Sequence, residues 1–204
     1  MGKVWVLRRL EGRYRLALLA AKRADISMTT AGATPGSTRS LVRMGATFLG
    51  LLAAMHLAYY ADKQLGLGLV DRPYTMAVAW LAGLLAKPVL PYPVRVDGVA
   101  LIADERISVV VASGCNGIEA ILLMVAGVVA YPAAWAQRGR ALVVYLPCLY
   151  ALNLVRVVAL THIAHTYPAF MDIAHLQVAQ GILILFVVTF WLHYLSRLDS
   201  SRCS

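Results

Sequence analysis

Three residue types that suit nucleophilic catalysis lie in or beside three separate apolar segments. Cys115 stands in the stretch Ser-Gly-Cys-Asn-Gly-Ile-Glu-Ala (113–120), where a polar loop runs into an apolar segment. Arg156 lies within the next apolar segment, and His175 begins the last one. A thiol can attack a carbonyl carbon, an imidazole can exchange the proton, and a guanidinium can stabilise the developing negative charge. This chemistry requires that the chain bring the three side chains together.

The residues around Cys115 favour a reactive thiol. Gly114 and Gly117 flank it, and glycine permits a tight turn and close approach of the backbone. A thiol at the N-terminus of a helix is exposed to the positive end of the helix dipole, so we expect a lowered pKa. Glu119 follows four residues after Cys115, which predicts a place on the same helix face. There it would orient Arg156 or pair with it.

Arg156 is unusual because apolar residues surround it in Asn-Leu-Val-Arg-Val-Val (153–158). A charged side chain within a membrane span costs about 2.5–3.5 kcal/mol on insertion scales and commonly marks function. Asn153 lies one helical turn earlier and can hold the guanidinium in place. We therefore expect Arg156 to support a thiolate or an oxyanion.

Three histidines compete for the role of general base. His175 begins the last apolar segment, whereas His162 and His165 lie one helical turn apart near the end of the previous one. The chemistry of the residues does not choose among the three. A His-x-x-His pair can also ligate a metal, but only Glu119 and Asp172 offer further ligands, so we expect no metal.

The composition indicates an integral membrane protein. The 204 residues are 60% hydrophobic and 14% charged, and the mean hydropathy is +0.70, whereas soluble domains contain about 25% charged residues. The formal net charge is +9, and such an excess in a membrane protein usually belongs to cytoplasmic segments. No aromatic base-stacking pattern accompanies the basic residues, so we expect no nucleic-acid partner. The three cysteines lack any metal-binding spacing.

We predict an all-α integral membrane protein with about four transmembrane helices. A span needs about 20 apolar residues, and the predicted spans are 42–60, 117–135, 141–164 and 176–195. Residues 75–86 are apolar but too short to span, which favours an interfacial or partly re-entrant helix on the outer side. Residues 92–112 alternate and contain two turn signals, which predicts a small outer β-hairpin.

The distribution of basic residues predicts the orientation. Lys and Arg concentrate in cytoplasmic loops, and the residues that decide here are Arg39, Arg43, Arg138, Arg140, Arg197 and Arg202. Both termini and a loop at 137–140 should therefore be cytoplasmic. We expect a basic N-terminal tail and linker at 1–40, a membrane domain at 41–196 and a cytoplasmic tail at 197–204. This orientation places Cys115, Arg156 and His175 together at the outer face.

Three sequence blocks resemble the exosortase/archaeosortase family, most closely its exosortase H subtype. They are Ser-Gly-Cys-Asn-Gly-Ile-Glu-Ala (113–120), Asn-Leu-Val-Arg-Val (153–157) and Ala-His-Leu-Gln-Val-Ala-Gln-Gly-Ile-Leu (174–183). The family consists of polytopic membrane transpeptidases that resemble sortases in chemistry but not in fold. Most members are longer and have more spans than this chain.

The resemblance implies a function for these blocks. Cys115 would be the nucleophile, Arg156 the electrostatic stabiliser and His175 the acid and base, with Asn116, Gly117, Glu119 and Asn153 in support. No cofactor is implied. The partners would be the lipid bilayer and exported proteins with a C-terminal signal made of a short motif, an apolar helix and a basic cluster. The enzyme would lie in the bacterial inner membrane, with its active site on the extracytoplasmic side.

A second class of function is compatible with the same residues. A non-enzymatic small membrane transporter or assembly factor can contain a buried ion pair, here between Arg156 and Glu119. The two classes differ in whether Cys115 is required.

Overall fold

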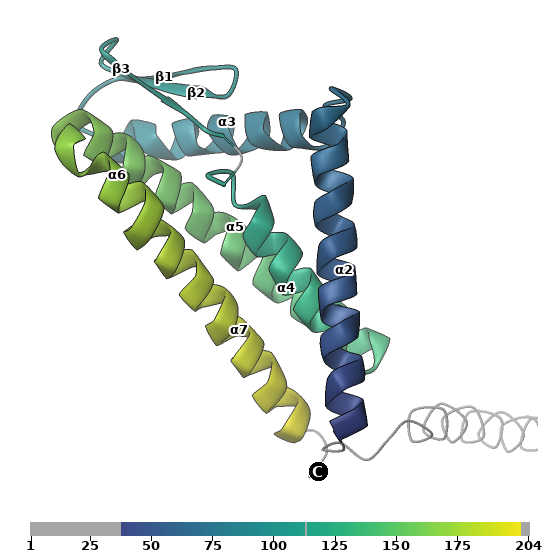
Figure 1. Cartoon of the computed structure of the whole chain (residues 1–204). Helices are drawn as coiled ribbons and strands as arrows, with labels where there is room; N and C mark the ends of the chain where they lie inside the picture. The colour runs from purple at the N-terminus through teal and green to yellow at the C-terminus, as the bar shows by residue number, and fades with distance from the viewer. Residues whose placement is uncertain (1–37, 113, 201–204) are drawn as a thin grey trace, which may run out of the picture. The chain divides into compact units, whose positions relative to one another are not determined.

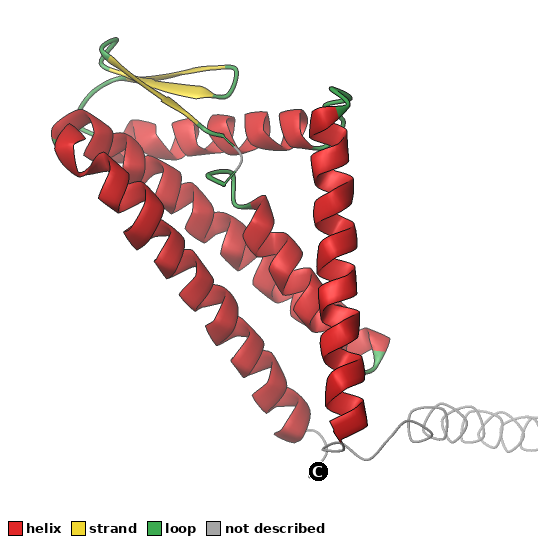
Figure 2. Cartoon of the chain, in the orientation of Figure 1, coloured by secondary structure: helices red, strands yellow, loops and turns green. Residues whose placement is uncertain are grey.

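The computed structural model describes residues 38–112 and 114–200, so most of the predicted tail at 1–40 and the end of the predicted cytoplasmic tail lie outside the described residues. Helices predominate, and one small sheet accompanies them (Figures 1 and 2). The longer helices are α2 (Thr38–Gln64), α3 (Asp71–Val89), α4 (Ile118–Ala130), α5 (Trp135–Thr166) and α7 (Gln180–Ser200). A 3-10 turn, η1 (Pro168–Phe170), the short α6 (Met171–Ile173) and a π-helical segment, η2 (Ala174–Ala179), precede α7. The contacts divide the chain into two units, Met1–Gly45 and Ala46–Ser204.

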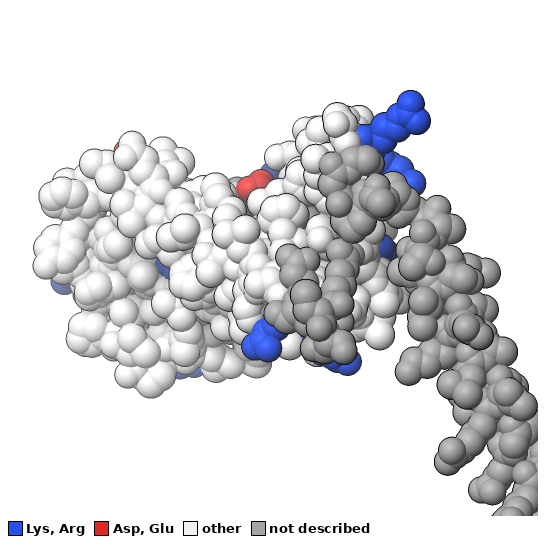
Figure 3. Space-filling model, turned by 90° about the horizontal axis from the view of Figure 1, so that it is seen from below, with Lys and Arg blue, Asp and Glu red and all other residues white. Residues whose placement is uncertain are grey.

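Three of the described helical stretches are long and apolar enough to cross a membrane. They are Thr38–Gln64, Trp135–Thr166 and Pro168–Leu198. Many large apolar side chains on them are exposed, for example Leu57, Val143 and Leu185, and the described side chains on the face shown in Figure 3 are mainly uncharged. Exposed apolar surface of this extent is typical of contact with lipid.

Helix α4 is shorter than the predicted span at 117–135. It contains 13 residues, which at 1.5 Å per residue reach about 20 Å, against about 30 Å for the hydrocarbon core. It ends at Ala130, because Pro132 disfavours the helical conformation of the residue before it. The predicted count of four spanning helices therefore rests on a helix that does not reach the usual length.

Residues 137–140 are not the loop that the sequence predicted, because they form the first turns of α5. Gln137 accepts a hydrogen bond from the backbone N–H of Ala134, 3.1 Å, and the Arg138 guanidinium donates to the carbonyl of Tyr131, 3.1 Å. Side chains of the first turn thus satisfy backbone groups around the helix start. The connection between α4 and α5 contains only residues 131–134.

The β-hairpin predicted within residues 92–112 had one strand too few. Strands β1 (Val94–Asp97), β2 (Ala100–Ala103) and β3 (Ile107–Val110) form an antiparallel sheet in the order β1-β2-β3. Both predicted turn signals are turns, and two turns connect three strands. Residues Asp104 and Glu105 in the second turn have positive φ angles of 50° and 55°.

Helix α3 lies between the sheet and the other helices, as Figure 1 shows. It extends beyond the predicted 75–86 on both sides and contains Pro88 in its last turn. Its small side chains form a core with the sheet and α5: Val78, Ala79, Ala82, Ala86, Val94, Leu101, Val111, Val157 and Val158. A Cβ atom at Gly83 would collide with Val96, so glycine permits this close packing of α3 on β1.

A second core joins α4, α5 and α7. Its most buried members include Met124, Val128, Leu149, Leu183 and Val187. Helix α5 contributes to both cores, its first half to this one and its second half to the core beneath the sheet. Through α5, the two cores place the loop before α4 near the start of the last helical stretch.

Candidate active site

Cys115 lies in a tight turn before α4. The carbonyl of Ala112 accepts hydrogen bonds from the backbone N–H groups of Cys115 and Asn116, at 2.9 and 3.0 Å. Gly114 and Gly117 have φ angles of 88° and 79°, which glycine adopts without strain. Because α4 begins only at Ile118, Cys115 is not helical, and the expectation that it shares a helix face with Glu119 is wrong.

The thiol of Cys115 contacts the imidazole of His175. The distance from Sγ to Nδ1 is 3.4 Å, across 60 residues of sequence. Cys115 is 7% exposed, and His175 belongs to the π-helical segment η2. Such π-helical turns often occur at functional sites. Nδ1 is within reach to accept the thiol proton.

Burial raises the pKa of the Cys115 thiol, and the positive charge of Arg156 partly offsets this effect. The lowered pKa expected from the helix terminus is therefore wrong in its net direction. Desolvation disfavours the thiolate more than the nearby charge favours it. The resting group is a neutral thiol, and its activation requires transfer of the proton to a base.

Arg156 is 8% exposed, and its Nε and Nη1 atoms are buried without a hydrogen-bond partner among the described residues. Within that part of the chain, Arg156 and Glu119 form no ion pair. Glu119 instead lines a groove with His56 on α2 and Gln180 on α7. The buried pair on which the non-enzymatic alternative depended is absent from the described structure.

The asparagines predicted to support the site are both buried. Asn153 donates through Nδ2 to the carbonyl of Asn116, 2.8 Å. It therefore holds the cysteine turn, whereas the sequence predicted that it would hold Arg156. A Cβ atom at Gly117 would lie 2.5 Å from Cγ of Asn153. The structure therefore places Asn116, Gly117 and Asn153 beside Cys115, whereas Glu119 points into the groove.

Sequence reasoning missed Tyr59, Asp71 and Thr75. All three accept hydrogen bonds from Nδ2 of Asn116, which follows the cysteine directly. They come from α2 and the start of α3, more than 40 residues earlier in the chain. An apolar segment that begins with polar side chains is a weak signal, and the sequence offered no stronger one.

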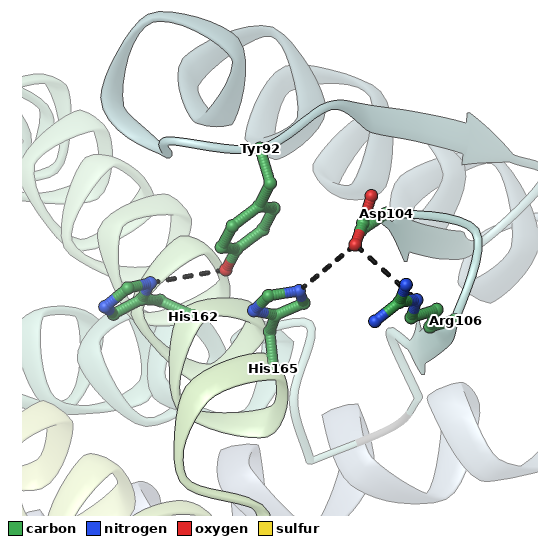
Figure 4. A network of polar contacts seen from close by, with 5 residues as sticks. All are labelled: Tyr92, Asp104, Arg106, His162 and His165. Carbon is green, nitrogen blue, oxygen red and sulfur yellow. Dashed lines mark hydrogen bonds and ion pairs between the residues drawn. The ribbon is translucent and has the colours of Figure 1, made fainter.

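His162 and His165 contact a different part of the molecule. His162 Nδ1 lies 3.3 Å from the hydroxyl of Tyr92, and the Tyr92 ring stacks on His165 with centroids 3.9 Å apart. His165 also approaches Asp104 in the second sheet turn, 3.9 Å (Figure 4). Of the three candidate histidines, His175 is the one that contacts Cys115. Among residues 38–112 and 114–200, no group of three or more acidic, histidine or cysteine side chains is arranged to hold a metal ion.

The fold and the site define a helical membrane protein with a buried cysteine, a histidine in contact with it and a buried arginine nearby. The chain matches the family model of the transmembrane exosortases over residues 5–194, and it belongs to this family. The predicted family is thereby confirmed. Comparison with the curated proteins found no match. Comparison with the solved structures found none either.

Proposed function

We propose that this protein is an exosortase-type cysteine transpeptidase, which cleaves the C-terminal sorting signal of exported proteins through an acyl-enzyme. The observation that carries the proposal is the 3.4 Å contact between Cys115 Sγ and His175 Nδ1. A thiol and an imidazole in contact are the minimal pair for nucleophilic attack assisted by a general base. Membership of the transmembrane exosortases supports the same reaction class.

The proposed reaction has two stages. The sulfur of Cys115 attacks the scissile carbonyl carbon while His175 takes the thiol proton. The tetrahedral intermediate collapses, the C–N bond breaks, and His175 returns the proton to the departing amine. The product is a thioester between Cys115 and the exported protein. An acceptor nucleophile then attacks the thioester carbonyl, and the sulfur leaves.

Arg156 would stabilise the oxyanion of both tetrahedral intermediates. Its Nε and Nη1 atoms are buried and unpartnered within the described structure, so their hydrogens are available to an incoming negative charge. Donors held in place in a site of low dielectric stabilise such charge strongly. The same charge favours the Cys115 thiolate.

The substrates proposed are exported proteins that end in a short motif, an apolar helix and a basic cluster. We place the enzyme in the bacterial inner membrane, with the site on the extracytoplasmic side. This orientation requires four crossings, by α2, by α4 with its flanking residues, by α5 and by the stretch from η1 to α7. The support for it is the distribution of Arg residues along the sequence. In the structure, Arg140 and Arg197 line the same groove.

The test replaces Cys115 by Ala and by Ser. Both variants are expected to abolish processing of a co-expressed exported protein that has such a C-terminal signal. The serine hydroxyl is a much weaker nucleophile at its free pKa than a cysteine thiol. Processing is measured by the change in substrate size on a gel, and membrane insertion of the enzyme by its amount in the membrane fraction.

Cys148→Ser is the matched control, because Cys148 is an exposed free cysteine on α5 outside the site. It is expected to process the substrate at the normal rate. Normal processing by Cys115→Ala would refute the enzymatic proposal.

A further inference from the structure

Asn116 is completely buried, and its side chain connects the cysteine turn to two other helices. Nδ2 lies 3.0 Å from Thr75 Oγ1 and 3.4 Å from both Tyr59 Oη and Asp71 Oδ1. Its Oδ1 accepts the backbone N–H of Ile118 at the start of α4, 3.2 Å. One side chain next to Cys115 therefore contacts α2, α3 and α4.

The far side of this connection is itself held firmly. The carboxylate of Asp62, near the end of α2, accepts the backbone N–H groups of Leu69, Val70 and Asp71, at 2.9, 3.0 and 3.2 Å. These amides lie at the start of α3, where a helix leaves its N–H groups without backbone partners. The hydroxyl of Tyr59 donates to Asp71 in a short hydrogen bond. Hydrogen bonds to Asp62 and Asp71 therefore make the junction of α2 and α3 an anchor, although most of its connecting residues are exposed.

Asn153 holds the same turn from the opposite side. It donates to the backbone carbonyl of Asn116, 2.8 Å, and its side chain occupies the space that a Cβ atom at Gly117 would need. The residues on both sides of the peptide bond between Asn116 and Gly117 are thus fixed, by α3 through Thr75 and by α5 through Asn153. Cys115 precedes this fixed unit directly.

We propose that Thr75, on α3, is a positioning residue for catalysis. It holds Asn116 so that Cys115 Sγ stays in contact with His175 Nδ1. This inference rests on the proposed function and deepens it, because it assigns α3 and its anchor a part in the reaction. Thr75 acts through Asn116, to which it is hydrogen-bonded, whereas the thiol and the imidazole contact each other. Catalytic geometry tolerates little displacement, and a shift of about 1 Å can cost about 100-fold in rate.

Distance and burial explain why the hydroxyl of Thr75 is needed to hold Asn116 in place. It is the nearest of the three acceptors to Nδ2, and Thr75 is 4% exposed. Replacing it by valine preserves the volume but leaves Nδ2 with two acceptors at 3.4 Å. A buried amide then shifts toward those acceptors, because unsatisfied polar groups are costly in a buried site. The shift carries the adjoining turn with it.

The test measures how strongly His175 influences the reactivity of Cys115, and it needs no protein substrate. The full chain with Cys148→Ser and Cys203→Ser is purified in detergent and alkylated with iodoacetamide, which leaves Cys115 as the only cysteine. His175→Ala is expected to slow alkylation about tenfold when Thr75 is present, since a hydrogen bond to a charged group is worth roughly that factor. In the Thr75→Val background the same change is expected to slow it by less than about twofold.

Two further variants separate positioning from general stability. Thr75→Ser retains the hydroxyl and is expected to preserve the tenfold effect of His175→Ala. Thr161→Val removes another buried hydroxyl, which donates to the carbonyl of Val157 on the same helix, 2.9 Å. This variant is also expected to preserve the tenfold effect of His175→Ala. Thermal unfolding is measured for every variant, and Thr75→Ala replaces Thr75→Val if the latter does not accumulate.

The inference is overturned if His175→Ala slows alkylation by the same factor with and without Thr75→Val. It is also overturned if His175→Ala slows alkylation in neither background. Loss of the effect in Thr75→Ser or in Thr161→Val overturns it as well. Failure of the proposed function has a different signature, which is substrate processing by Cys115→Ala whatever the alkylation rates. A Thr75→Val enzyme that processes substrate at the normal rate while Cys115→Ala is inactive contradicts the positioning role alone.

Discussion

At the scale of single residues, the site combines a neutral thiol with a cation. Burial raises the pKa of Cys115, and Arg156 opposes this effect without overcoming it. The thiol is therefore protonated at neutral pH until His175 removes the proton. A cysteine that stays neutral at rest is less prone to oxidation and alkylation than a preformed thiolate.

Arg156→Gln is expected to raise the pKa of Cys115 further, because the substitution removes a positive charge that favours the thiolate. Alkylation of Cys115 is followed against pH in the Cys148→Ser, Cys203→Ser background. Its midpoint should lie above that of an ordinary thiol and should move to higher pH in the variant.

Arg138→Gln is the control for this shift, because Arg138 lies in the first turn of α5, stacked on Trp135. In Arg138→Gln, the pH midpoint of Cys115 alkylation should equal that of the Cys148→Ser, Cys203→Ser background. A midpoint that moves to lower pH in Arg156→Gln would contradict the stated electrostatics.

The types of the reacting residues were readable from the sequence, but their supports were not. Cys115 and Arg156 stand out because each is a reactive or charged residue in an apolar setting. The choice of His175 came from the family resemblance, and the structure places that residue in contact with the thiol. The hydrogen bonds from Nδ2 of Asn116 to α2 and α3 join residues 41 to 57 positions apart, and no local pattern predicts such pairs.

At the scale of secondary-structure elements, the turn before α4 depends on two glycines with different surroundings. Gly114 and Gly117 both have positive φ angles. A Cβ atom at Gly117 would meet the side chain of Asn153, whereas one at Gly114 would have no described atom within 4 Å apart from its chain neighbours. The two positions therefore separate backbone strain from steric collision.

Gly117→Ala is expected to abolish processing and to destabilise the protein more than Gly114→Ala does. Both variants incur the cost of a left-handed backbone, about 1–2 kcal/mol. Only the first also displaces Asn153, which releases the carbonyl of Asn116. Thermal unfolding and substrate processing are measured for both, and equal effects in the two variants would argue against the collision.

Local sequence signals account for several elements and mislead at one. The end of α4 follows from Pro132, and the strand boundaries follow from the turns around Gly98 and Asp104. The polar run at 137–140 has the composition of a loop, yet Gln137 and Arg138 lie in the first turn of α5 and bond to backbone groups just before that helix. Composition alone does not distinguish a capped helix start from a loop.

At the scale of the whole molecule, the proposed orientation determines which helices cross the bilayer. The described chain contains three helical stretches of spanning length, and the proposed orientation needs a fourth crossing through the shorter α4. Residues 131–134 extend the path of α4 beyond its C-terminal end. A short crossing is compatible with a bilayer that thins locally.

Cys115 is expected to react with a membrane-impermeant maleimide from the extracytoplasmic side of intact spheroplasts. The experiment uses the Cys148→Ser, Cys203→Ser background, so that Cys115 alone can be labelled. Ser200→Cys in a background that also contains Cys115→Ala should react only after the membrane is opened. The opposite pattern of labelling would reverse the proposed orientation.

The buried Nε and Nη1 atoms of Arg156, which lack a hydrogen-bond partner among the described residues, have a consequence for the energetics of turnover. A buried cation without a counter-charge destabilises the folded protein, and the apolar cores must offset that cost. In the proposed reaction, a neutral peptide carbonyl relieves little of it, whereas the oxyanion of the intermediate relieves most of it. Differential binding of this kind lowers the activation barrier without increasing the affinity for substrate or product. The folded enzyme would thus contain, before any substrate binds, an unfavourable electrostatic free energy that is relieved mainly in the transition state.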